Sequence, residues 1–116
     1  MIITPASTIA GHNVVKTLGL VRGNTIRARH LGRDIMAALK GMVGGEIEEY
    51  TKMMAEAREQ AVDRMVAEAT RLGANAVTDV RFMTSVIMGA ASEILAFGNA
   101  VIVNPEPSSH ATQESQ

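Results

Sequence analysis

EIEEYTKMMAEAREQAVDRMVAEATRL, residues Glu46–Leu72, is the most regular segment of this 116-residue chain. Its apolar residues recur every three or four positions, close to the 3.6-residue period of an α-helix. Acidic residues occupy the first turn and Arg71 the last, as the helix dipole favours, and Gly73 follows as a C-terminal cap. The pattern predicts one long amphipathic helix with a buried stripe. That stripe comprises Ile47, Tyr50, Met54, Ala57, Ala61, Met65, Ala69 and Leu72.

The segments after this helix predict an antiparallel hairpin. Asn75–Ile87 and Glu93–Val103 are rich in β-forming residues and flank the turn Gly89-Ala90-Ala91-Ser92. Both faces of the second strand are apolar, whereas a sheet with one wet face alternates apolar and polar residues. The face with small side chains can seat the long helix closely. Its residues are Ile94, Ala96, Gly98, Ala100 and Ile102.

The opposite face of that strand needs a cover that a small domain lacks. Its residues are Leu95, Phe97, Val101 and Val103. We expect these four side chains to form an interface between copies of the chain.

The segments before the long helix predict extended structure and a second, shorter helix. Ile2-Ile3-Thr4 is a short strand ended by Pro5. His12–Arg22 is a second strand, with turns expected at Gly11 and Gly23-Asn24. Leu31–Val43 has apolar residues at helical spacing and ends at Gly44-Gly45.

These elements predict an α+β fold, a small antiparallel sheet packed on one long and one short helix. We expect one domain over residues 1–103 and a disordered tail over 104–116, where Pro, Ser and polar residues dominate. Only three residues are aromatic, and much of the apolar content is Ala and Met, so the core of one copy is poor in large side chains. Burial between copies would compensate, which favours a homo-oligomer that assembles through sheet faces or edges.

The composition excludes several classes of function. Eleven basic and twelve acidic residues give a net charge of −1, so no basic footprint for nucleic acid is present. Without cysteine, the chain has no disulfide, thiolate metal site or catalytic thiol. No apolar run reaches the roughly 18 residues that span a bilayer, and the N-terminus does not resemble a signal peptide. We therefore expect no membrane partner and a cytoplasmic location.

Candidate metal ligands are few. His12, His30 and His110 share no ligand spacing, and the first two lie in or beside predicted turns. Glu56, Glu59 and Asp63 share one helix face and could offer oxygen ligands to a hard cation. The same pattern is typical of the solvated face of an amphipathic helix. A metal ion therefore stays one candidate cofactor among others.

No catalytic constellation is evident, so we expect no enzyme. The chain has no nucleophile-elbow serine, and its glycine-rich segments match neither a phosphate-binding loop nor a dinucleotide fingerprint.

The chain contains, in order and without large gaps, the segments Leu18–Gly23, Arg33-Asp34-Ile35, Gly44–Tyr50, Ala57–Ala61, Leu72–Val77 and Gly98–Val101. Together these segments resemble the YbjQ-like family, whose label is heavy-metal-binding. The resemblance covers roughly residues 3 to 103 and implies a strand–helix–two-strand unit similar to dodecin subunits, assembled as a homopentamer, with no established activity. The chain departs from the family pattern at Glu46-Ile47, where Arg-Ser is usual, and at Thr17, where an aromatic residue is common.

Together these features favour a non-enzymatic homo-oligomeric binding protein, and the resemblance implies that the oligomer is a pentamer. Its ligand would be a small molecule or metal ion held between subunits or on the ring axis. The alternative is a structural or interaction scaffold with no ligand, whose ring displays the C-terminal tail.

Overall fold

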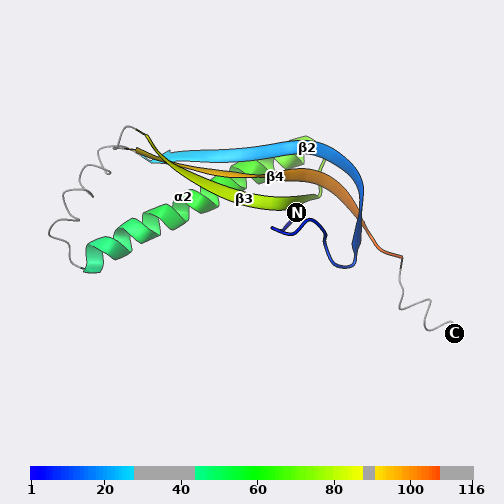
Figure 1. Ribbon diagram of the computed structural model, residues 1–116, viewed down its shortest axis with the longest axis horizontal. Coiled ribbons are helices and arrows are strands. Elements are labelled where there is room, and N and C mark those ends of the chain that lie inside the picture. Colours follow the sequence, from blue (N-terminus) through cyan, green and yellow to red (C-terminus); the bar gives the residue numbers. More distant parts are fainter. Residues whose placement is uncertain (28–43, 88–90, 108–116) are drawn as a thin grey trace.

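In a computed structural model, the described residues form a four-stranded sheet with one long helix across it (Figure 1). The structure describes residues 1–27, 44–87 and 91–107, so the short helix expected over Leu31–Val43 lies outside the described residues. The α+β prediction is confirmed. The elements are β1 (Ile2–Ile3), β2 (His12–Arg27), α2 (Gly44–Arg71), β3 (Ala76–Ile87) and β4 (Ala91–Pro105).

The sheet has the strand order β1-β3-β4-β2. β3 and β4 form the predicted hairpin, and β2 pairs antiparallel with the other edge of β4. β1 runs parallel to β3, so the sheet is mixed rather than purely antiparallel. A parallel pair needs a long crossover, and the chain between β1 and β3, which includes α2, supplies it. β4 continues to Pro105, two residues past the expected end of this strand.

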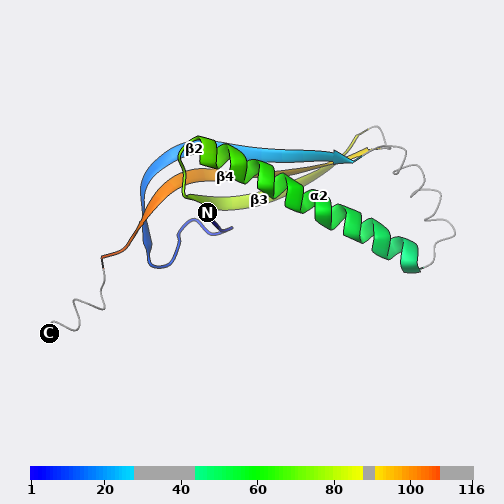
Figure 2. The same ribbon diagram turned by 180° about the vertical axis from the view of Figure 1, so that it is seen from behind.

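α2 lies diagonally across one face of the sheet (Figure 2). Ala57, Ala61, Met65 and Ala69 are fully buried and pack with Val21, Val77, Ile94, Ala96 and Ala100. This confirms the centre of the predicted helical stripe. Leu72 was wrongly included, because it lies in the turn after the helix and is 44% exposed. The side chains of Ile47 and Tyr50 lie outside the described part of the chain.

Gly23 marks a close approach between β2 and α2, and the turn expected at Gly23-Asn24 is wrong. β2 runs straight through this position to Arg27. A Cβ atom on Gly23 would lie 2.3 Å from the Ala61 carbonyl oxygen and 2.4 Å from the Met65 amide nitrogen. Beside it, the buried Thr25 hydroxyl donates a 2.8 Å hydrogen bond to the Ala57 carbonyl oxygen. The glycine therefore lets helix backbone rest on strand backbone.

The end of α2 forms a glycine-capped corner. The Gly73 amide donates to the Thr70 carbonyl and the Ala74 amide to the Ala69 carbonyl, each at 3.0 Å, and Gly73 has a φ of 91°. This is the predicted cap, in the Schellman arrangement. Asn75 then pairs with Val103 like a strand residue: its side-chain nitrogen donates to the Val103 carbonyl at 2.9 Å, and its side-chain oxygen accepts from the Val103 amide at 2.8 Å.

Candidate functional site

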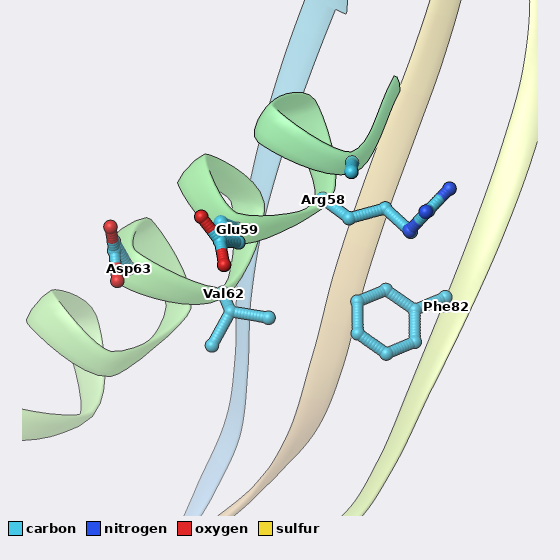
Figure 3. Close-up of a pocket in the computed structure, with 6 residues that line it drawn as sticks. Arg58, Glu59, Val62, Asp63 and Phe82 are labelled. Carbon is cyan, nitrogen blue, oxygen red and sulfur yellow. The ribbon is translucent and has the colours of Figure 1, made fainter. Parts of the chain in front are cut away.

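An open pocket of about 700 Å³ lies between α2 and β3. Because α2 crosses the sheet obliquely, it covers β2 and β4 more fully than β3, and Phe82 of β3 stays 49% exposed. In Figure 3, Arg58 and Val62 extend from α2 toward Phe82, whereas Glu59 and Asp63 lie farther from that ring. The pocket is lined by Ala55, Arg58, Glu59, Val62, Asp63 and Phe82.

The pocket combines an apolar floor with charges of both signs. Val62 and Phe82 supply apolar surface, Arg58 supplies a guanidinium group, and Glu59 and Asp63 supply carboxylates. Such a lining suits a small ligand with an apolar body and polar ends. The carboxylates lie four residues apart on one helix and offer the oxygen ligands that hard cations prefer.

The other candidate metal ligands do not join this pocket. Glu56 is exposed on α2 but does not line it. The Nδ1 atom of His12 lies 3.0 Å from the Ala10 carbonyl oxygen in the turn before β2. His30 and His110 fall outside the described residues. Within residues 1–27, 44–87 and 91–107, no group of three or more His, Cys, Asp or Glu side chains could hold a metal ion.

The donor set therefore does not fit a heavy-metal centre inside the described part of one copy. Soft metals favour thiolates and clustered imidazoles, and the chain has no cysteine. A metal held here would need further ligands from beyond the pocket, and the two carboxylates would select a hard cation.

The predicted interface residues divide into two pairs. Val101 and Val103 are buried within the chain, in a small cluster with Ala76 against which Ile9 packs. Leu95 and Phe97 lie half-buried on the sheet face opposite α2, in register with Asn24 and Arg22 of β2 and with Met83 and Arg81 of β3. Leu20, Ile26 and Met83 are 55–60% exposed. We call the apolar residues of this face, Leu20, Ile26, Met83, Leu95 and Phe97, the outer face.

Asp79 was missed by the sequence analysis. It interrupts β3 with a φ of 57°, at a register shift between Thr78 and Arg81. Its carboxylate accepts hydrogen bonds from the Ser7 hydroxyl at 2.7 Å, the Thr78 hydroxyl at 3.0 Å and the Asn99 side-chain nitrogen at 3.1 Å. An Asp inside a β-rich run was the available signal, since Asp is depleted in strands and tolerates left-handed backbone.

These contacts set the charge of Asp79. The hydrogen bond from Ser7 lowers the pKa of the Asp79 carboxyl below its ordinary value, and those from Thr78 and Asn99 and the charge of Arg81 act in the same direction. Partial desolvation opposes them. The carboxylate is thus held ionised as a hydrogen-bond acceptor, with its partners already in place.

No helix in the described ranges is long and apolar enough to cross a membrane. Comparison with known proteins places the chain among uncharacterised relatives. A family model described as "Putative heavy-metal-binding" matches residues 1–104. A "UPF0145 protein" of Dehalococcoides mccartyi is 59% identical over 103 residues, which cover 89% of this chain and 99% of that protein. One from Methanosarcina acetivorans is 58% identical, with 87% and 95% covered.

A solved structure shares the fold. It is a protein of unknown function of the DUF74 family from Pediococcus pentosaceus, with a TM-score of 0.60 and 15% identity. The match covers 90% of this chain and 98% of that one.

Proposed function

This chain belongs to the YbjQ-like family, and on that premise we propose that it is a non-enzymatic domain that assembles with copies of itself and holds a small ligand or metal ion between them. The observation that carries the proposal is the pocket between α2 and β3. It has the mixed lining of a binding site, yet it is open to solvent in one copy, and its Phe82 side chain is 49% exposed. A neighbouring copy would close it.

The position of the pocket supports a shared site. Phe82 lies in the part of β3 from Arg81 to Ile87, which pairs with β4 on one side and with no described strand on the other. A strand added to this open edge would lie beside Phe82 and could complete the lining. The number of copies, five, comes from the family resemblance, and a ring would repeat the site at every contact.

The outer face favours the alternative, a scaffold without a ligand. Its apolar side chains could bury one another between copies and stabilise an assembly that needs no bound molecule. In that case the pocket would be a by-product of the oblique packing of α2, and removal of its charges would change nothing that the protein does.

Native and denaturing mass spectra of one untagged sample distinguish the two functions. A binding protein should carry stoichiometric extra mass that is lost on denaturation, and the mass identifies a metal or an organic ligand. Such a ligand also raises the melting temperature by mass action. An assembly with no extra mass, and no thermal shift with Mg²⁺, Ca²⁺ or Zn²⁺, would contradict the binding role and favour the scaffold.

Matched variants of α2 locate the ligand. Glu59 and Glu56 are both exposed on this helix, but only Glu59 lines the pocket. We expect Glu59→Gln to weaken retention of the extra mass and Glu56→Gln to leave it unchanged. Equal effects of the two substitutions would place the ligand elsewhere.

A further inference from the structure

The N-terminal segment lies along the outer edge of β3. The Ile2 amide donates to the Asn75 carbonyl at 3.2 Å, and the Thr4 amide donates to the Val77 carbonyl at 3.0 Å. The Val80 amide donates in return to the Thr4 carbonyl at 3.1 Å. We call residues Met1–Ile9 the strap. The strap occupies the edge of β3 along the first residues of that strand, where a strand from another molecule could otherwise pair.

A second set of contacts fixes the strap where β3 is irregular. The Ser7 hydroxyl donates to Asp79, and the Asp79 amide donates to the Ala6 carbonyl at 3.0 Å. The Arg81 guanidinium donates to the Pro5 carbonyl at 2.8 Å. Farther along, Ile9 packs against the cluster of Ala76, Val101 and Val103. Backbone, charged and apolar contacts therefore all hold the strap in place.

The irregularity itself opposes strand pairing. Asp79 adopts left-handed backbone, and the register of β3 shifts between Thr78 and Arg81. A bulge twists an edge away from a flat partner, and a charged residue such as Arg81 discourages pairing further. Left-handed backbone is costly for a residue with a Cβ atom, so the contacts of Asp79 must offset that cost.

The strap divides the edge of β3 into two parts. Beyond Arg81 the strand continues to Ile87, and no described strand pairs with its outer side. β2 forms the opposite edge of the same sheet and pairs only with β4 among the described strands. One copy thus presents two different open edges. Pairing of one with the other is a head-to-tail contact, the kind that closes rings.

We infer that the strap is an edge guard, latched by Asp79, that blocks Ala76–Val80 and leaves Arg81–Ile87 as the part of β3 that a second copy can join. The inference rests on the proposed self-association. It specifies where along β3 the second copy pairs, because a neighbour confined to Arg81–Ile87 lies beside Phe82 and the pocket. Without the guard, the longer open edge would accept neighbours in several registers.

Two substitutions release the strap from different sides. Thr4→Pro removes the amide that donates to Val77 and leaves β3 unchanged. Asp79→Gly removes the latch carboxylate but keeps a residue that tolerates positive φ. Asp79→Asn is the matched control, since it retains an acceptor oxygen and the tolerance of left-handed backbone. Ser7→Ala is a milder variant, because it removes the hydrogen bond from Ser7 to Asp79 and changes the backbone of neither the strap nor β3.

Hydrogen exchange measures the release of the strap, and native mass spectrometry measures the effect of that release on assembly. We expect the Ile2 and Val80 amides, which bond between the strap and β3 in the wild type, to exchange at least about tenfold faster in Thr4→Pro and Asp79→Gly. Amides of β4 should remain protected and show that the sheet is folded. The same variants should give a broader distribution of masses, with species larger than the wild-type assembly. Asp79→Asn should stay close to wild type in both measurements.

Two results would overturn the inference. If the strap exchanges faster but the masses match wild type, the strap is no guard. If Asp79→Gly leaves the strap protected while Thr4→Pro frees it, Asp79 is no latch. A wild-type monomer would instead contradict the proposed self-association, and larger species in the released variants would then still support the guard.

Discussion

The two faces of the sheet differ in how far one copy of the chain completes them. On the helix side, Gly23 and alanines of α2 bring backbone to within van der Waals distance, and every side chain in the central cluster is buried. On the opposite side, Leu20, Ile26 and Met83 remain more than half exposed. Small residues thus let α2 pack tightly over β2 and β4. Phe82 stays exposed on this side, and Leu20, Ile26 and Met83 stay exposed on the other. We take this asymmetry as support for the proposed self-association.

One methionine on each side of the sheet allows the sharpest comparison. Met65 of α2 is fully buried against the sheet, whereas Met83 of β3 is 55% exposed on the outer face. We expect Met65→Ala to lower the free energy of unfolding by about 2–5 kcal/mol, because it leaves a cavity. Met83→Ala should lower it by less than about 1 kcal/mol in a dissociated sample. Denaturant titrations at fixed protein concentration measure both values, and similar losses would remove the distinction between the faces.

A methyl group at the helix–strand contact is the next largest change. Gly23→Ala places a Cβ atom against the backbone of Ala61 and Met65, which cannot rotate away. We expect a loss of about 1–3 kcal/mol in stability from this overpacking. Thr17→Ala, at an exposed position of the same strand, is the control and should change stability by no more than about 0.5 kcal/mol. An unchanged stability for Gly23→Ala would show that α2 lies farther from β2.

A charge on the outer face should act on assembly more than on folding. Phe97→Asp replaces an aromatic ring of that face with a carboxylate, in register with Arg22 and Arg81, and burial between copies would desolvate this carboxylate. We expect the variant to dissociate in size-exclusion chromatography while it keeps the circular dichroism of the folded chain. Phe97→Leu is the control and should remain assembled. A fully assembled Phe97→Asp would mean that copies meet through edges alone.

The smallest expected effect is a pH dependence from Asp79. Its folded pKa is lowered from the ordinary 3.8, so its contribution to stability is present above about pH 4 and is lost as the pH falls through the folded value. Thermal unfolding between pH 2 and pH 6 should therefore show a steeper acid loss for wild type than for Asp79→Asn. If the unfolding temperatures of the two proteins fall in parallel as the pH is lowered, the contacts with the strap do not stabilise the ionised form of Asp79.

Periodicity predicted the regular parts of the fold well. The helical spacing of Ala57, Ala61 and Met65 and the cap at Gly73 were confirmed, because these features depend on local geometry. The role of Gly23 could not be read in the same way, since a glycine in a turn and a glycine under a helix look alike in sequence. The parallel pairing of β1 with β3 also depends on contacts between residues far apart in the chain.

The candidate site was less accessible to sequence reasoning. Glu59 and Asp63 were identified from their helix spacing, but Arg58, Val62 and Phe82 join them only because α2 crosses the sheet at an angle. Val101 and Val103, expected at an interface between copies, are covered within the chain by Ala76 and Ile9. The Asp79 network joins the strap to β3 and β4 across the sheet, and no sequence motif announces it.

The central claim is that copies of the chain cover one another's outer face. Its most direct test is the native mass of the untagged wild-type protein at micromolar concentration. One chain has a mass of 12.3 kDa, and we expect a single assembly of five chains, about 61.5 kDa. A stable monomer of 12.3 kDa at that concentration would contradict the account, because the exposed apolar face would then need no partner.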